Sequence, residues 1–217
     1  MNQKEKSRQS REKIIESAIQ EFGTKGFRGA TINAVCGRGI AKGLLYHYFS
    51  GKEELFLICA EKCFSSFIEY LRQRGGGENL EKCLELRARF FQDNPLYARI
   101  FFEALLQPPV GLGREIKEAR REYEEFNRAL YRQMISRLTL RKGVSEKMAL
   151  EHFELMQDMF NCYFNSPAYA GHDMQALMEA HEEKLGTVLD LMLYGIAQKR
   201  IVVDGEAEDI DEKKEDK

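Results

Sequence analysis

The sequence of 217 residues lacks the features that mark several large classes of protein. No apolar run approaches the roughly 18–20 residues that a membrane-spanning helix needs, so we expect no membrane partner. The first thirteen residues, MNQKEKSRQSREK, contain no apolar segment of a secretory signal. The five cysteines show no Cys-x-x-Cys spacing, which suits a reducing compartment better than a disulfide framework. These absences together predict a cytoplasmic protein.

Signatures of strands and of catalysis are also missing. Alternating β-branched runs do not occur, which argues against a β fold. The sequence has no Gly-x-Ser-x-Gly elbow, no His-Glu-x-x-His pair and no Walker sequence. Its four histidines offer no His-x-x-x-His pair for a metal ion. We therefore expect a protein that is not an enzyme and that uses no cofactor and no metal.

The charges are distributed unevenly along the chain. Residues 1–52 carry ten Lys and Arg against four Glu, a net charge of +6. Residues 204–217 carry eight acidic side chains against three Lys, a net charge of −5. Only the basic N-terminal part is therefore suited to a polyanion such as DNA.

Apolar residues recur at helical spacing through most of the chain, which predicts an all-α protein. Helices are expected at about 11–22, 32–38, 42–49, 52–72, 78–93, 95–106, 113–141, 145–165 and 173–199. Thr31 is expected to cap the second helix, and Ser50 with Glu53 has the capping-box spacing before the fourth. Three short helices are thus followed by longer ones that suit a helical bundle.

The run GLLYHYFSGKEEL at 43–55 places three aromatic residues and a histidine side by side. Adjacent side chains point all round a helix turn, so some of these rings must face outward. Leu45 and Phe49, four residues apart, are expected to pack inward. Two short helices joined by a glycine turn form a helix-turn-helix, whose second helix enters the major groove of DNA.

The third short helix has the chemistry of such a recognition helix. A lysine and polar ring tips can contact phosphates and base edges, and a glycine lets the backbone approach closely. A lysine in the first turn of the following helix can hold a phosphate together with free backbone N–H groups. The residues expected to bind DNA are Thr31, Ala41, Lys42, Gly43, Leu44, Tyr46, His47, Tyr48 and Lys52.

Residues 11–55 resemble the DNA-binding domain of TetR-family transcriptional regulators. The matching pieces are REKIIESAIQEFGTKGF at 11–27, ATI at 30–32 and AKGLLYHYFSGKEEL at 41–55. The segment before the turn glycine, Gly39, is one residue shorter than is usual in the family, which implies a shortened second helix or a tighter turn. Leu44 stands where many relatives have a polar residue.

The resemblance implies a domain plan and a function. The plan is a flexible basic arm at 1–10, a helix-turn-helix DNA-binding domain at 11–51, a ligand-binding and dimerisation domain at 52–201, and an acidic disordered tail at 202–217. The implied function is a homodimeric repressor that a small apolar or amphipathic effector releases from palindromic operator DNA. The alternative is an effector-free helical DNA-binding protein with an architectural role.

The bundle carries the expected effector site and dimer interface. Aromatic and Met residues there are numerous enough to line an apolar cavity, although each alone suits an ordinary core. The residues expected at the effector are Phe91, Tyr97, Phe102, Met134, Phe160 and Tyr163. In the family that this chain resembles, two helices corresponding to 145–165 and 173–199 form the dimer interface. Examples of their apolar side chains are Met148, Phe153, Met156, Met159, Phe160, Leu177, Leu185, Leu189, Met192 and Ile196.

Cys59 and Cys63 lie one helix turn apart and allow two interpretations. A metal site would need two further ligands, which the sequence does not offer nearby. Adjacent helical thiols are more often small buried residues, and this is the reading that we prefer.

Overall fold

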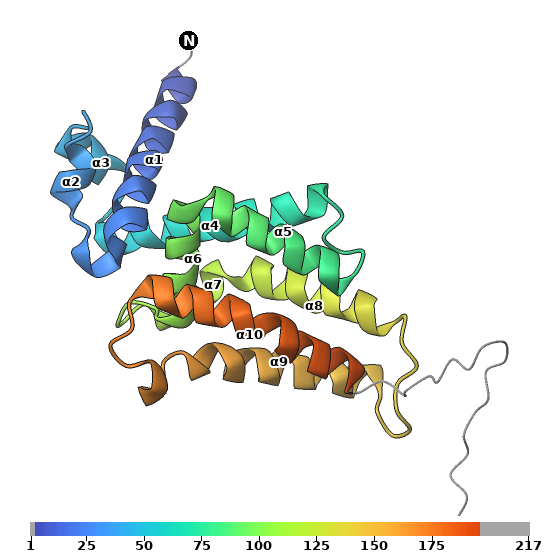
Figure 1. Cartoon of the computed structure of the whole chain (residues 1–217). Coiled ribbons are helices and arrows are strands. Elements are labelled where there is room, and N and C mark those ends of the chain that lie inside the picture. Colours follow the sequence, from blue (N-terminus) through green and yellow to red (C-terminus); the bar gives the residue numbers. More distant parts are fainter. Residues whose placement is uncertain (1–2, 196–217) are drawn as a thin grey trace, which may run out of the picture.

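A computed structural model of the chain describes residues 3–195, and it confirms the all-α fold class (Figure 1). The helices are α1 (Gln3–Gly29), α2 (Ile32–Cys36), α3 (Lys42–Tyr48), α4 (Lys52–Gln73), α5 (Leu80–Asp93), α6 (Pro95–Leu106), α7 (Gly113–Ala119), α8 (Arg121–Ile135), α9 (Glu146–Tyr163) and α10 (Met174–Tyr194). A short 3₁₀ turn (Pro167–Tyr169) lies between the last two. The predicted acidic tail and Ile196 lie outside the described residues.

Helices α1, α2 and α3 pack together at one end of the molecule, as Figure 1 shows. Leu45 and Phe49 are almost wholly buried, which confirms that this side of the third helix faces inward. Thr31 caps α2 as expected, because its side chain accepts the Ala34 N–H at 3.2 Å. The second helix ends early, at Cys36, and Gly39 makes the turn with a φ of 79°. The short spacing before Gly39 therefore shortens the helix.

The first helix is longer than the sequence pattern predicts. It begins at Gln3, so the segment 3–10, predicted as a flexible arm, continues the helix instead. One contact with the third-helix region lies within this extension: the Ser7 and Tyr48 hydroxyls lie 2.8 Å apart. The helix also passes through Gly23 and kinks at Gly26, where φ is 69°.

Two further expectations about helix ends were wrong. Ser50 does not cap α4 through Glu53: its N–H and hydroxyl both donate to the Glu54 carboxylate, at 2.6 and 2.7 Å. These bonds lower the pKa of Glu54. The predicted helix 113–141 is divided at Arg120 into α7 and α8, because the backbone there leaves the helical region (φ −92°, ψ 3°). A sequence period cannot detect a break without Gly or Pro.

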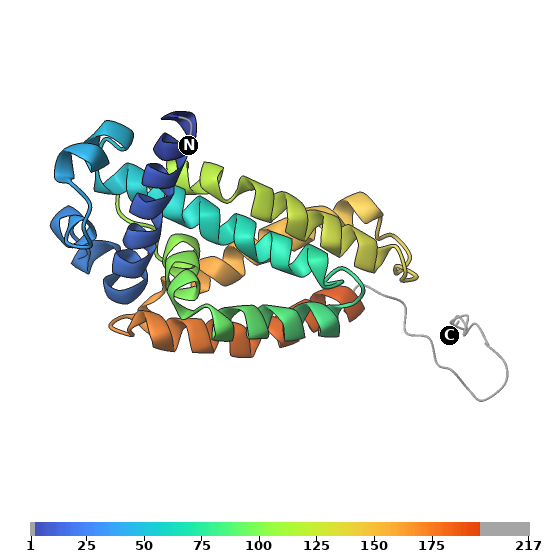
Figure 2. The same cartoon turned by 90° about the horizontal axis from the view of Figure 1, so that it is seen from above.

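Helices α4 to α10 form the bundle. Figure 2 shows α4, α5, α8, α9 and α10 as long, roughly aligned rods, with the three-helix domain at one end. The three-helix domain contacts the bundle chiefly through α6, which packs across α1. A Cβ atom on Gly23 would lie 2.7 Å from the Leu96 Cβ, so a larger residue here would force the two helices apart. Glu103 of α6 accepts the Phe27 N–H with both oxygens, at 3.0 Å each.

Candidate nucleic-acid interface and internal cavity

The outward face of α3 presents the side chains that the sequence analysis selected. Lys42, Gly43, Leu44, Tyr46 and His47 are all exposed, and space around the Gly43 Cα is open. Tyr48 is half-buried, since its hydroxyl meets Ser7 of α1. One face of α3 therefore presents the ammonium group of Lys42, the polar ring atoms of Tyr46 and His47, and an accessible backbone at Gly43.

The other three predicted residues surround this face. Thr31 and Ala41 are exposed at the starts of α2 and α3, although the Thr31 side chain is already used as a helix cap. Lys52 begins α4, and its ammonium lies 4.5 Å from the centre of the Phe27 ring. This cation–π contact places the Lys52 charge beside the domain junction. Whether these residues bind DNA stays a prediction.

Buried polar groups hold α2 against α1. The Ser17 hydroxyl donates to the Val35 carbonyl at 2.8 Å. The Glu21 carboxylate is 2% exposed, and it accepts the Lys25 ammonium at 2.9 Å and the Thr31 N–H at 3.4 Å. Arg38 lies 3.8 Å from the same carboxylate. Because the buried Ser17 hydroxyl and Glu21 carboxylate both have partners, these bonds fix the orientation of the helix-turn-helix.

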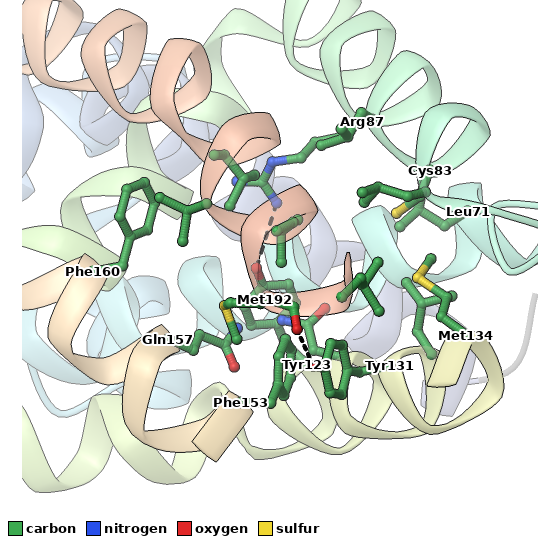
Figure 3. A pocket seen from close by; sticks show the side chains of 18 of the residues that line it. Leu71, Cys83, Arg87, Tyr123, Tyr131, Met134, Phe153, Gln157, Phe160 and Met192 are labelled. Atoms are coloured by element: carbon green, nitrogen blue, oxygen red, sulfur yellow. Dashed lines mark hydrogen bonds between the residues drawn. The ribbon is translucent and has the colours of Figure 1, made fainter. Parts of the chain in front are cut away.

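A cavity of about 80 Å³ lies among α4, α5, α8, α9 and α10 (Figure 3). Its walls are mostly apolar. The residues labelled in Figure 3 are Leu71, Cys83, Arg87, Tyr123, Tyr131, Met134, Phe153, Gln157, Phe160 and Met192, and all of them line it. The Tyr131 hydroxyl donates to the Met192 carbonyl at 3.3 Å, and burial raises the pKa of Tyr131 to about 12.

Only two of the six predicted effector residues line this cavity, Met134 and Phe160. Phe91 and Phe102 are buried within a cluster of rings instead, 4.9 Å apart between centroids. Tyr97 borders a separate hollow between α1 and α6, and Tyr163 is exposed on the outer side of α9. The spacing in the sequence indicated that the bundle has more aromatic side chains than one inward face per helix requires. It could not show which helix each of these rings faces.

A buried polar cluster that no sequence pattern predicted lies at the cavity. Arg87, 5% exposed, donates to Glu182 at 2.7 Å and lies 3.4 Å from the Tyr123 hydroxyl. Its guanidinium also packs over the rings of Phe67, Phe91, Phe101 and Phe102, within 4.9–5.6 Å of their centroids. Arg87 holds the pKa of Glu182 at about 2 against the cost of burial.

His181 extends the same cluster. One ring nitrogen lies 2.9 Å from Glu182 and the other 3.2 Å from the Asn161 side chain. Burial lowers the pKa of His181, so the ring is neutral at pH 7. The cluster therefore holds one positive and one negative charge. No pattern in the sequence brings together residues 87, 123, 161 and 181, because only the tertiary fold does so.

The two helical cysteines are ordinary core residues. Cys59 and Cys63 are fully buried, and burial raises the pKa of both thiols. Thiols in this state are unreactive.

The outer side of α9 is unusually apolar. Met148, Leu155, Met159 and Tyr163 follow one another at helical spacing, and each is more than 40% exposed. Leu191 and Tyr194 of α10 are exposed as well. Phe153, Phe160, Leu177, Leu185, Leu189 and Met192, which were expected in this outer set, are buried or half-buried and face the interior. The exposed apolar face thus includes three of the expected residues, Met148, Met156 and Met159, and otherwise consists of residues that were not expected.

Two family models match the chain. Residues 14–59 match the model described as bacterial regulatory proteins, tetR family. Residues 74–196 match the model described as tetracyclin repressor-like, C-terminal domain, and this match alone covers more than half of the chain. The first match falls on the helix-turn-helix and the second on the bundle.

Two characterised relatives are regulators. The chain is 29% identical over 128 residues to the biofilm operon icaADBC HTH-type negative transcriptional regulator IcaR of Staphylococcus epidermidis, covering 58% of this chain and 67% of that protein. It is 31% identical over 87 residues to the HTH-type transcriptional repressor AcnR of Corynebacterium glutamicum, covering 40% of this chain and 46% of that protein. The chain thus spans about two thirds of the first relative and less than half of the second.

Solved structures share the fold at low sequence identity. The transcriptional regulator FadR from Bacillus subtilis, crystallised in complex with stearoyl-CoA, is 19% identical with a TM-score of 0.57, covering 85% of this chain and 98% of that one. A putative tetR family regulator from Shewanella sp. PV-4 is 19% identical with a TM-score of 0.56, covering 88% and 99%. Among residues 3–195, no helix combines the length and apolarity that crossing a membrane requires.

Proposed function

This chain belongs to the TetR family of bacterial regulatory proteins, which are DNA-binding regulators and not enzymes, and from that premise we propose that it is a homodimeric repressor released from its operator by a small effector. One observation carries the proposal: an exposed, basic recognition helix and an internal cavity occur in the same chain. The effector-free alternative gives no role to the cavity. Such a repressor acts in the cytoplasm, where the DNA is.

The DNA-binding part of the proposal rests on α3. Its outward face carries Lys42, Tyr46 and His47, while the inward Leu45 and Phe49 anchor it. A lysine there contributes sequence-independent affinity, and the ring tips can reach base edges. The relatives named as a negative regulator and as a repressor favour repression over activation.

The homodimer is proposed from the apolar outer side of α9 and α10. The stripe that includes Leu155, Met159 and Tyr163 is exposed, and contiguous apolar surface of this kind often marks a protein–protein contact. Covering it with the same stripe of a second copy gives a two-fold dimer with two recognition helices. The operator is then a palindrome whose half-sites lie about 34–36 Å or a multiple apart.

The effector part rests on the cavity size. Its volume of about 80 Å³ is well below the roughly 300–1,000 Å³ of sites that hold drug-sized ligands. An effector must therefore separate the helices around it, and so it prefers a different conformer of the bundle. That preference can change the spacing of the two recognition helices.

The test begins by selecting binding sites from a random DNA library. We expect a palindrome, whereas sequence-independent coating of DNA would support the effector-free alternative. Compounds that raise the melting temperature are then titrated by calorimetry with and without that operator. A tenfold loss of operator affinity corresponds to about 1.4 kcal/mol, and DNA must weaken the ligand equally. Equal ligand affinities in both titrations would remove the effector from the proposal.

A further inference from the structure

The cavity has one polar and one apolar end. Tyr123 and Asn127 in the first half of α8, Gln157 and Asn161 in the second half of α9, and His181 in the first half of α10 form the polar end. Leu80, Met134, Phe153 and Leu193 line the other end. In Figure 3, Phe160 and Gln157 lie on one side, and Leu71, Cys83 and Met134 on the other. His181 and Leu193 are separated along α10 by roughly 18 Å, so the cavity is elongated.

The charges at the polar end already neutralise each other. Arg87 and Glu182 form a close ion pair, and Glu182 also meets His181. A ligand that brought a net charge into this end would add a buried charge with no free partner, which is strongly unfavourable. The cavity therefore selects against a charged group within it.

Two amides at the polar end remain available. Asn127 and Gln157 line the cavity from the neighbouring helices α8 and α9. Both side chains are half-buried, and within residues 3–195 neither forms a hydrogen bond with another residue. An amide offers both a donor and an acceptor, so the pair can bind a hydroxyl, carbonyl or amide group. Groups of this kind in an otherwise apolar cavity fix the orientation of a ligand.

A route to the surface starts at the same end. Tyr123, Gln157 and Asn161 also line an open surface cleft between α8 and α9. The cleft carries charged residues, but these are largely paired: Arg128 with Glu154, and Arg120 with Glu124 at 2.6 Å. A ligand can therefore enter with its apolar part first and leave its polar head near the entrance.

Building on the proposed function, we infer that the effector is an elongated amphipath with an uncharged polar head. Its apolar tail points towards Met134 and Leu193, and its head forms hydrogen bonds with Asn127 and Gln157. The head lies at the end where His181 contacts Phe102 of α6, with ring centroids 5.3 Å apart. Since α6 packs on α1, the head is placed where it can affect the DNA-binding domain.

The test compares three probes that share a ten-carbon chain and differ in the head: decanamide, decanoate and decyltrimethylammonium. Each is titrated into the full-length protein by calorimetry, below its aggregation concentration. We expect decanamide to bind at least tenfold more tightly than either charged probe. The double substitution Asn127→Leu/Gln157→Leu should reduce decanamide affinity about tenfold. The control is Gln133→Leu, an exposed amide of α8 outside the cavity, which should change nothing.

A charged probe that binds as tightly as decanamide would overturn the inference. So would failure of decanamide to bind, or a double variant that binds it unchanged while keeping a normal melting temperature. If the Leu substitutions unfold the protein, Asn127→Ala and Gln157→Ala remove the same amides with smaller side chains. A different result would contradict the proposed function: selection from the random DNA library would then yield no specific binding site. A regulator that binds a palindrome but ignores decanamide keeps its function and loses only this effector class.

Discussion

Lys42 and Lys52 are the single residues on which DNA affinity is expected to depend most directly. Lys42 opens α3 and is exposed, while Lys52 opens α4 and rests on the Phe27 ring. Each lysine that neutralises a phosphate releases counterions, so affinity falls with salt.

We expect Lys42→Ala and Lys52→Ala each to weaken binding to all sequences and to lower the salt slope by about one. Fluorescence anisotropy at several salt concentrations measures this slope. Lys82→Ala on α5, far from the recognition helix in sequence, is the matched control. A double variant with an unchanged slope would show that the phosphate contacts lie elsewhere.

His181 makes stability depend on pH. Burial lowers its pKa in the folded protein below the value of 6.5 expected when unfolded, so at intermediate pH the unfolded chain binds more protons. Stability is therefore full above about pH 6.5 and is lost as the pH falls towards the folded-state pKa.

The melting temperature should thus decrease between pH 7 and pH 5, and His181→Gln should make that decrease smaller. Thermal melts at each pH provide the measurement, with the exposed His172→Gln as control. The slope against pH, rather than the absolute melting temperature, is compared, because the substitution also removes contacts. An identical slope in both variants would contradict the assignment.

At the scale of elements, α6 is the joint between the DNA-binding domain and the bundle. Glu103 accepts the Phe27 N–H just after the kink at Gly26, and Gly23 allows the close approach to Leu96. Glu103 is half-buried at this contact, and burial raises the pKa of its carboxyl group.

Removing the Glu103 carboxylate should weaken the contact between α6 and α1 without unfolding the bundle. We expect Glu103→Ala to destabilise the protein by about 1–3 kcal/mol, because it leaves a buried N–H unpaired. Hydrogen exchange should become faster around Phe27 and stay unchanged around Phe153. Glu85→Ala, at an exposed site on α5, is the control. Uniformly faster exchange would mean that Glu103 supports the whole fold rather than the joint.

At the scale of the whole molecule, the proposed dimer depends on the outer side of α9. A charge within an apolar interface has no partner there and is costly to bury. Met159→Glu, at a position 57% exposed in the single chain, should therefore produce monomers. The chain has a mass of 25.2 kDa, so sedimentation at micromolar concentration distinguishes one copy from two. Glu118→Gln on α7 is the control, and a Met159→Glu protein that stays dimeric would place the interface elsewhere.

Loss of the dimer should also weaken operator binding, because each monomer then binds a half-site independently. Stability of the monomer itself should change little, since Met159 does not belong to the buried core. A monomeric variant that kept full affinity for the whole palindrome would show that dimerisation is not needed for recognition.

Much of this protein was determined by local sequence. Helical spacing gave the all-α class, and Thr31, Leu45 and Phe49 behave as their positions predicted. These features depend on neighbours within a few residues, such as a cap and the N–H that it accepts. The resemblance over residues 11–55 also placed the exposed face of α3, because that short motif is a self-contained unit.

Other features were decided only by tertiary structure. The helical state of 3–10 is accompanied by a contact between Ser7 and Tyr48, which lie 41 residues apart in the chain. Phe91 and Phe102 do not line the cavity, because both rings pack around the buried Arg87, which pairs with Glu182 from a distant part of the chain. Periodicity tells which residues of a helix share a face. It does not tell which helix that face will meet, and here that choice determines the cavity and its polar end.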